Sequence, residues 1–350
     1  MHFDFSDDQR LLQQTVRDFL AGECGPERVR ALWEEPTGRS RALWRRLAEI
    51  GLVGARVPEA HEGMGVSEVE LVLLCEEVGR AGLAEPVVST AAVAAPLLAE
   101  IGSQELAERW LKPIAVGDAI VAVGHAHSAF VADAHVADLL LLPDGDDLHA
   151  VLPADVELEA QPASDPARRL QRVRFTPSDA TRIAAGGTGR AIQAAALDRG
   201  ALASAAQLLG AAERLISLAV AYAKQREQFG VPIGSFQAVK HQLANALVKL
   251  EYARPLVYRA AWSVARAVAP RSVHVSMAKV AAGEAGALAS RTALQVHGAI
   301  GYTWEQDLHI WMRRCASLDH EWGLPHFHRQ RMADFALAED APTGAGNTFR

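Results

Sequence analysis

Three long segments in the second half of the chain carry apolar residues at helical spacing, and no other feature constrains the fold as strongly. They are residues 192–224, 235–267 and 272–296. Apolar residues three and four positions apart form a stripe along one side of a helix, and that stripe must be buried against another element. Shorter helices are predicted to begin at Trp304 and Pro325. Successive helices of this kind predict a helical bundle over residues 188–338.

The first 115 residues also follow helical patterns. Ser6 with Gln9, and Ser67 with Glu70, have the spacing of capping boxes, which mark the beginnings of helices. Gly82 suits the end of the second of these helices, because glycine readily adopts the left-handed conformation found there. Residues 1–115 are therefore predicted to form an N-terminal helical domain. Its other helices are expected at residues 41–50, 90–101 and 104–111.

Residues 116–180 differ from both flanking segments, because their apolar runs are short and separated by turn-forming clusters. Gln171, Val173 and Phe175 alternate with arginines, which is the period of a strand with one buried face. The sequence thus predicts a mainly α protein in which a small β-domain separates two helical domains, with residues 339–350 as a tail. The expected strands are residues 119–123, 139–142, 148–152, 156–158 and 170–175.

Composition and motifs exclude several classes of protein. The chain has 35 Lys and Arg against 42 Asp and Glu, a net charge of −7, and nucleic-acid binding needs clustered positive charge. Strands do not alternate with helices, and neither the G-x-G-x-x-G nor the G-x-x-x-x-G-K-[ST] motif is present in a suitable context, so a Rossmann or phosphate-loop enzyme is not predicted. The 13 histidines are scattered without three ligands in register, so no metal site is predicted.

The sequence also bears on where the protein works. Its beginning, M-H-F-D-F-S-D-D-Q, lacks the basic and apolar regions of a secretory signal. Apolar runs are interrupted well before the 18 residues that a membrane-spanning helix needs. The three cysteines lie far apart, and Cys75 follows the apolar run 71–74, so we expect it to be a small buried hydrophobic residue. These features predict a cytoplasmic protein without membrane association.

Four motifs point to a known family. Residues 226–241 read R-E-Q-F-G-V-P-I-G-S-F-Q-A-V-K-H, and residues 295–302 read Q-V-H-G-A-I-G-Y. Both resemble signatures of the acyl-CoA dehydrogenases. Residues 57–65 (V-P-E-A-H-E-G-M-G) and 76–82 (E-E-V-G-R-A-G) are also similar to that family, with Glu62 in place of the usual first glycine of a pair. The resemblance covers nearly the whole chain. It implies the family's fold, with an N-terminal helical bundle, a middle β-domain and a C-terminal four-helix bundle.

The resemblance implies FAD as the cofactor and assigns its contacts. A guanidinium such as that of Arg226 can neutralise the pyrophosphate, and Phe229 offers an apolar surface to the adenine. The side-chain amides of Gln237 and Gln295 can bind the edges of the cofactor. Gly298, like Gly301, would permit close approach of the backbone. In the family these residues serve an FAD held mainly by a neighbouring subunit, so an oligomer is implied.

The implied reaction is removal of two hydrogens across Cα–Cβ of an acyl-CoA thioester, which gives the 2-enoyl-CoA. In the family a carboxylate takes the α proton, the β hydrogen passes as hydride to the flavin, and an electron-transferring flavoprotein reoxidises the flavin. The common base is a Glu followed by Gly. Here the matching pair is Trp322–Gly323, with Glu321 one position early and Asp319 three positions early. One residue turns a helical side chain by about 100°, so no catalytic residue is assigned.

Two further departures accompany the missing base. Some members place the base on an earlier helix, but the matching stretch 197–202 offers only Asp198. The β-domain is short and contains no tryptophan, and the family's flavin-covering loop is replaced by V-G-H-A-H-S-A-F at 123–130. The chain therefore resembles the short, base-lacking subunits of heteromeric bacterial steroid-type acyl-CoA dehydrogenases, which implies a partner subunit and a bulky, steroid-derived acyl-CoA.

Three interpretations remain open at this point. The chain is a subunit that works with a base-carrying second chain, or a homo-oligomeric enzyme that uses Glu321 or Asp319 as an atypical base. The third interpretation is a non-catalytic scaffold in which the family motifs persist only as packing. The intact stretches 226–237 and 295–301 argue against the scaffold, because packing alone requires neither a charged Arg nor two Gln there.

Overall fold

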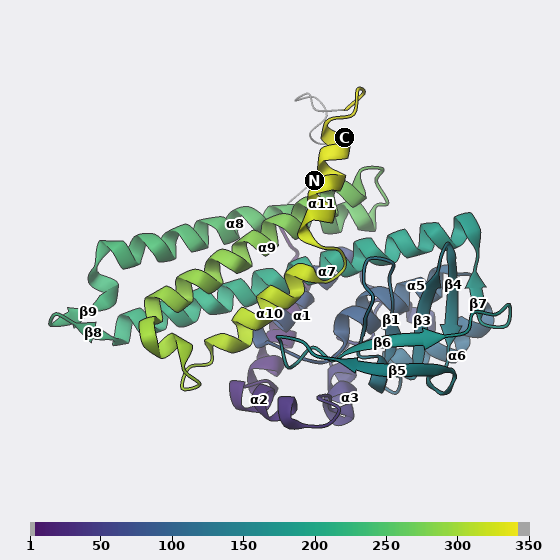
Figure 1. Cartoon of the computed structure of the whole chain (residues 1–350), viewed down its shortest axis with the longest axis horizontal. Helices are drawn as coiled ribbons and strands as arrows, with labels where there is room; N and C mark the ends of the chain where they lie inside the picture. Colours follow the sequence, from purple (N-terminus) through teal and green to yellow (C-terminus); the bar gives the residue numbers. More distant parts are fainter. Residues whose placement is uncertain (1–3, 342–350) are drawn as a thin grey trace.

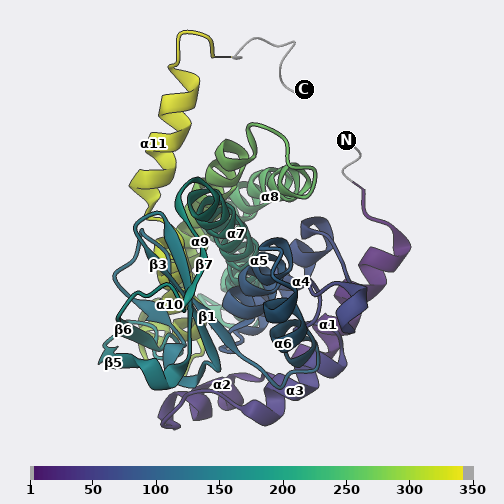
Figure 2. The same cartoon turned by 90° about the vertical axis from the view of Figure 1, so that its right-hand side faces the viewer.

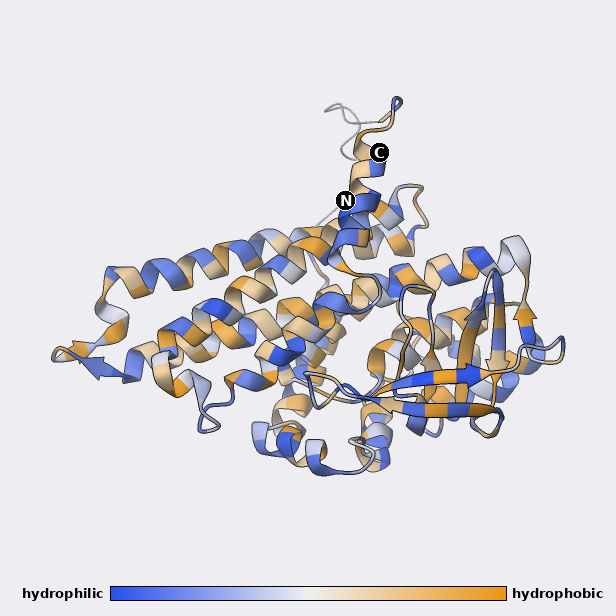
Figure 3. Ribbon diagram, viewed as in Figure 1, coloured by the Kyte–Doolittle hydropathy of each residue, from blue (hydrophilic) through white to orange (hydrophobic). Residues whose placement is uncertain are grey.

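The predicted C-terminal bundle is present in the structure, a computed structural model that describes residues 4–341. Its four helices pack against one another in the arrangement of Figure 1. Hydrophobic and hydrophilic residues alternate along them, which is what an antiparallel bundle with one buried side per helix requires (Figure 3). The bundle helices are α7 (Gly186–Gln225), α8 (Gln237–Ala265), α9 (Arg271–His297) and α10 (Leu308–His320).

The N-terminal helices pack against this bundle mainly through α4, which lies along α7. The capping boxes of Ser6 with Gln9 and of Ser67 with Glu70 both form, and Gly82 ends α4 in the left-handed conformation. These helices are α1 (Asp7–Glu23), α2 (Pro26–Glu34), α3 (Arg41–Glu49), α4 (Glu68–Ala81), α5 (Ala95–Glu100) and α6 (Gln104–Ala115). A short helix, η1 (Glu59–His61), lies between α3 and α4.

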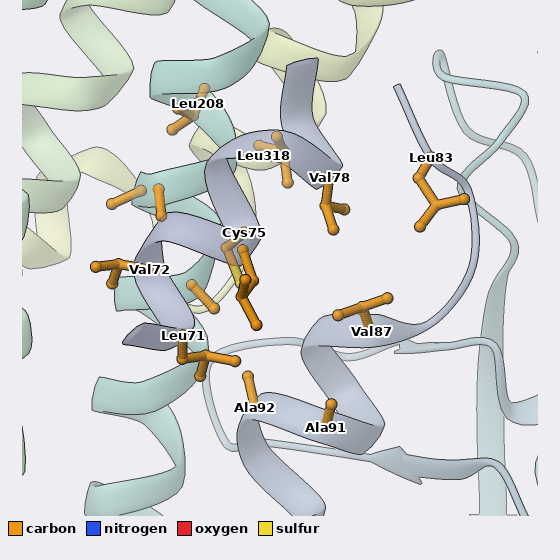
Figure 4. Close-up of a cluster of buried hydrophobic side chains, with 14 of the residues drawn as sticks. Leu71, Val72, Cys75, Val78, Leu83, Val87, Ala91, Ala92, Leu208 and Leu318 are labelled. Carbon is orange, nitrogen blue, oxygen red and sulfur yellow. The ribbon is translucent and has the colours of Figure 1, made fainter. Parts of the chain in front are cut away.

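Cys75 lies in the core between α4, α7 and α10, where it packs among aliphatic side chains (Figure 4). It is fully buried, and burial raises the pKa of its thiol to about 12, so it behaves as a small hydrophobic residue as predicted.

Two small sheets form the β region, which lies to the left of α4–α6 in Figure 2. The first has the order β1-β3-β4-β7, in which β1 and β3 are parallel and the other pairs antiparallel, and the second is antiparallel with the order β2-β6-β5. The strands are β1 (Val121–Val123), β2 (Val131–Ala132), β3 (Leu139–Asp144), β4 (Asp147–Val151), β5 (Val156–Gln161), β6 (Leu170–Phe175) and β7 (Arg182–Ala184), with short helices η3 (Ala134–Val136) and η4 (Pro153–Asp155).

Several elements differ from the prediction. Helix α2 and strands β2 and β7 were not predicted, and α7 begins six residues before the expected start at 192. The expected helix over 90–101 is a π-helix, η2 (Val88–Ala94), followed by α5. Residues 342–350 of the predicted tail lie outside the described residues. The division at 115, 180 and 188 into separate domains stays a prediction.

The remaining elements complete the C-terminal part. A hairpin of β8 (Glu227–Gln228) and β9 (Val231–Pro232) followed by η5 (Ile233–Ser235) joins α7 to α8. η6 (Gly298–Tyr302) follows α9, and α11 (Pro325–Ala336) projects from the body of the molecule in both views (Figures 1 and 2). None of the helices within residues 4–341 is long and apolar enough to cross a membrane.

Candidate functional site

The hairpin between α7 and α8 holds three of the five predicted cofactor residues. Arg226 follows the last residue of α7 with extended backbone, and its side chain is exposed. Phe229 stands at the tip of the hairpin with a φ of 55° and is 93% exposed, its ring perpendicular to that of Phe236 with the centroids 6.1 Å apart. Gln237 opens α8 and is exposed. All three side chains are thus turned toward solvent.

The other two predicted residues lie at the end of α9. Gln295 is exposed in its last turn, and Gly298 ends the helix with a φ of 63°, a conformation that favours glycine. The rings of Tyr222 and His297 stack with centroids 4.3 Å apart, which holds the ends of α7 and α9 together. The five predicted residues therefore share one end of the bundle, the end at the left of Figure 1.

This end of the bundle is unusually rich in exposed aromatic surface. Tyr302 is 79% exposed and Trp304 64%, in addition to Phe229. Among the residues that the structure describes, none forms an ion pair or hydrogen bond with the Arg226 guanidinium. Exposed aromatic rings around an unpaired guanidinium are what a buried contact with an aromatic, anionic ligand and a second subunit would use. Sequence reasoning did not single out Tyr222, His297 or Trp304 for this site.

A second place of interest is the turn after α10, where the family's base would stand. The backbone at Trp322 has a φ of 54°, which is costly for a bulky residue, and the side chain is 6% exposed. Its indole lies against Gly200 of α7, where an added Cβ would be 2.1 Å from Trp322 Cδ2. On its other side the imidazole of His125 stacks on it, with centroids 4.6 Å apart.

The contact between Trp322 and Gly200 joins the two predicted locations of a base. Position 322 is one, and Gly200 belongs to the stretch 197–202 that is the other. Asp198 of that stretch is buried and paired with Arg331 at 2.8 Å, so it serves the packing of α11. Where a carboxylate beside an open cavity was expected, the chain has the indole of Trp322 packed on Gly200.

The two carboxylates nearest in sequence are also engaged. Glu321 forms an ion pair with Arg168 of the β region, at 2.9 Å between Nε and Oε1. Asp319 lies against α9, since a Cβ at Gly283 would be within 1.9 Å of its Oδ1. Both carboxylates are thus directed at neighbouring elements of the fold rather than at an open site.

A cavity of about 80 Å³ lies beside Trp322, between the segment 83–89 that follows α4, helices α7 and α10, and the β region. Burial raises the pKa of Glu85, which lines it, to about 7. Glu85 accepts a hydrogen bond from the backbone N–H of Ser40 at 2.9 Å, and its second oxygen has no partner among the described residues. The charged side chains of the wall are Arg39, Glu85, Asp133, Asp165, Arg168, Arg314 and Glu321. The wall is therefore polar rather than shaped for an apolar chain.

Comparison with known families decides the identity. The family model of the acyl-CoA dehydrogenase N-terminal domain matches residues 6–118, and that of the C-terminal domain matches residues 187–336. The chain belongs to the acyl-CoA dehydrogenase family. Residues 119–186, which lie between the two matches, hold the β region.

Individual relatives agree with the family. The chain is 32% identical to acyl-CoA dehydrogenase IpdE2 of Mycolicibacterium smegmatis over 93% of its own length and 98% of that protein's, and 33% identical to IpdE2 of Mycobacterium tuberculosis over 88% and 91%. Among solved structures, the ChsE4–ChsE5 complex from Mycobacterium tuberculosis superposes with a TM-score of 0.86 at 26% identity, covering 97% of this acyl-CoA dehydrogenase and all of that chain. The steroid acyl-CoA dehydrogenase Tcur3481–Tcur3483 gives 0.84 at 26% identity, covering 94% and 97%.

Proposed function

We propose that the chain is the smaller subunit of a heteromeric, FAD-dependent acyl-CoA dehydrogenase that oxidises a bulky acyl-CoA thioester to the 2-enoyl-CoA. The observation that carries this proposal is the contrast between two parts of the bundle. One end of it presents Arg226, Gln237 and Gln295 to solvent, whereas the turn after α10 holds Trp322 at the position where the resemblance places the base. The first is proposed as a contact surface for a cofactor shared with a second subunit, and the second as a closed catalytic position.

The residues at the end of the bundle fit FAD. Arg226 has no structural partner among the described residues, so its guanidinium is free to pair with a pyrophosphate by two hydrogen bonds. The exposed ring of Phe229 offers an apolar face to the adenine, and the amides of Gln237 and Gln295 can both donate and accept at the cofactor's polar edges. FAD, when bound, supplies the hydride acceptor. This chain's part is to hold and orient it.

The base is proposed to come from the second subunit. In this chain Glu321 is paired with Arg168 and Asp198 with Arg331, and position 322 is an indole. None of the three can abstract the α proton of a thioester in this arrangement. A partner acyl-CoA dehydrogenase chain that carries the Glu–Gly pair would provide the base, and the exposed aromatic residues Phe229, Tyr302 and Trp304 provide a surface for it.

The substrate and the electron acceptor are inferred from relatives. A similar solved structure is described as a steroid acyl-CoA dehydrogenase, and another is a complex of two chains, ChsE4 and ChsE5. We assign a steroid-derived acyl-CoA as the substrate class and an electron-transferring flavoprotein as the partner that reoxidises the flavin. These assignments rest on family likeness and are the first to test by substrate screening.

The other two interpretations are less well supported. A homo-oligomer that uses Glu321 or Asp319 would need Glu321 to leave Arg168, and Asp319 to turn away from α9. A scaffold without cofactor would not explain Arg226 and Phe229, because both side chains are exposed and neither contributes to packing.

A complementation assay tests the proposal. The chain and a base-carrying acyl-CoA dehydrogenase encoded beside it are each produced and purified alone, and in a second preparation the two chains are produced in the same cells. Oxidation of a steroid side-chain acyl-CoA is measured for each preparation by the bleaching of the flavin absorbance. The proposal expects activity only for the co-produced pair. Full activity of this chain alone would refute it, and the Glu321→Gln variant would then show whether Glu321 is the base.

A further inference from the structure

The turn at 319–323 is held by two buried contacts and one half-buried ion pair. The ammonium of Lys279, on α9, donates to the carbonyl oxygens of Leu318 at 2.7 Å and of Asp319 at 2.9 Å. Lys279 is 1% exposed, and burial lowers its pKa to about 8. A cation at the C-terminal end of α10 satisfies carbonyl groups that a helix leaves unpaired there. It thereby fixes the point at which the chain leaves the helix.

The backbone of Trp322 itself is fixed by His328 of α11. Nε2 of His328 lies 3.1 Å from the carbonyl oxygen of Trp322, which can only accept, so Nε2 carries the proton. Nδ1 then accepts from the hydroxyl of Ser276, at 3.0 Å. His328 is completely buried. The third contact is the ion pair of Glu321 with Arg168, which ties the turn to the β region.

These contacts impose an unfavourable backbone conformation in order to place one side chain. A tryptophan with a φ of 54° costs energy that the surroundings must offset. Gly200 is the complementary feature, because any larger residue there would collide with the indole. His125 closes the remaining side by stacking. A ring held between Gly200 and His125, on a strained turn, is a built feature of the fold.

The volume of the cavity beside the Trp322 ring indicates whether a ligand can bind there. The adjoining cavity has about 80 Å³, whereas sites that bind small molecules usually have roughly 300–1,000 Å³. That volume suits a few water molecules rather than an organic ligand. An acyl chain with its thioester does not fit while the indole is in place.

We propose that Trp322 is a plug that fills this chain's own acyl site, so that the chain binds no acyl thioester by itself. The inference rests on the proposed function and deepens it, because it explains why a second subunit must hold the substrate. The plug is the indole of Trp322, and Gly200 and His125 form its seat.

Binding of butyryl-CoA to the chain purified alone, measured by calorimetry, tests the plug. We expect no saturable binding by the wild-type chain up to about 1 mM, and binding at least about tenfold tighter by Trp322→Ala, because the substitution opens the site. Trp110→Ala is the matched control, since Trp110 is a buried tryptophan on α6, remote in sequence from the turn. It should remain unable to bind butyryl-CoA.

Two further measurements keep the test decisive. Free indole should raise the melting temperature of Trp322→Ala by refilling the space, and Trp322→Leu replaces the alanine variant if that one does not fold. Binding of one butyryl-CoA per wild-type chain overturns the proposal. A folded variant that accepts indole but no butyryl-CoA, or neither ligand, also overturns it. The binding assay contains no flavin and no partner subunit. A negative result for the plug therefore does not decide the proposed function, which is tested separately by the ratio of flavin to polypeptide.

Discussion

The indole of Trp322 and the backbone of Gly200 are so close that a Cβ on residue 200 would lie 2.1 Å from Cδ2 of the ring. A large side chain at position 322 thus lies on a glycine of the stretch 197–202, and these are the two regions in which the resemblance to the family led us to expect a base. This relationship underlies the proposal that the chain is not a self-sufficient member of the family, because the ring takes space that a carboxylate and a thioester would need.

The contact predicts that Gly200→Ala is destabilising. The added methyl group must displace the buried indole, and overpacking of this kind costs typically about 1–3 kcal/mol of the free energy of unfolding. Combining it with Trp322→Ala should cost less than the sum of the two single changes, since the collision is then removed. Gly22→Ala is the control, because a Cβ at Gly22 in α1 meets nothing within 4 Å. Denaturant unfolding of the four variants measures this, and additive costs would contradict it.

Arg226→Ala should weaken flavin retention in the assembled enzyme. Loss of a charge-assisted hydrogen bond costs on the order of 1.5–3 kcal/mol, which is about a 10- to 150-fold rise in the dissociation constant for FAD. Helix content by circular dichroism should not change, because the side chain is exposed and has no partner among the described residues. Arg109→Ala, which removes an exposed Arg from α6, should leave flavin binding intact. Equal rates of flavin release from wild type and Arg226→Ala would contradict the assignment of Arg226 as a cofactor contact.

Protonation of His328 should oppose folding in mild acid. Burial lowers its pKa to about 3, so the native state keeps it neutral while the unfolded chain binds a proton below its ordinary pKa of 6.5. Stability therefore falls as the pH falls from 6.5, by up to about 1.4 kcal/mol per pH unit.

The variant His328→Gln isolates this contribution. It should be less stable than wild type at pH 7, because it loses the packing and the hydrogen bonds to Ser276 and Trp322. The difference in unfolding free energy between wild type and His328→Gln should shrink by about 2 kcal/mol between pH 6.5 and pH 5. The wild-type chain loses stability over this range because its unfolded state binds a proton at His328 and its native state does not. Parallel curves of stability against pH would show that His328 titrates alike in both states.

Arg254 should be more important to stability than a surface ion pair of the same length. It joins α8 to Glu76 of α4 at 2.6 Å and to Glu213 of α7 at 2.5 Å, and Glu76 is 3% exposed. Arg254→Met leaves the Glu76 carboxyl buried without its partner, which costs about 3–5 kcal/mol. Lys249→Met, which breaks an exposed pair with Glu284 also at 2.6 Å, should cost less than about 1 kcal/mol. Equal shifts in thermal unfolding would contradict the distinction.

The sequence predicted those parts of the fold that depend on local patterns. The capping box of Ser67 and Glu70 and the left-handed Gly82 bound α4 as expected, because such signals act within a few residues. The π-helix at 88–94 could not be predicted in this way. Its residues are small or apolar on all sides, and Ser89 and Thr90 donate to the carbonyl oxygen of Val121 on β1. That partner is supplied by the tertiary fold.

The candidate site shows the same division. Arg226 and Gln295 could be proposed from the sequence because they belong to contiguous motifs, and so could the replacement of the expected base by Trp322. The stacking of Tyr222 on His297, and of His125 on Trp322, joins residues from separate elements. No periodicity or motif in a single sequence encodes such a pair, so both had to await the structure.

The most direct test of the whole account is the ratio of flavin to polypeptide, measured from the visible spectrum of the purified protein. The account predicts no bound flavin when the chain is produced alone, and half a flavin per polypeptide when it is produced with a base-carrying acyl-CoA dehydrogenase. One flavin per chain in the protein produced alone would contradict it, because the chain would then hold a whole cofactor without a second subunit.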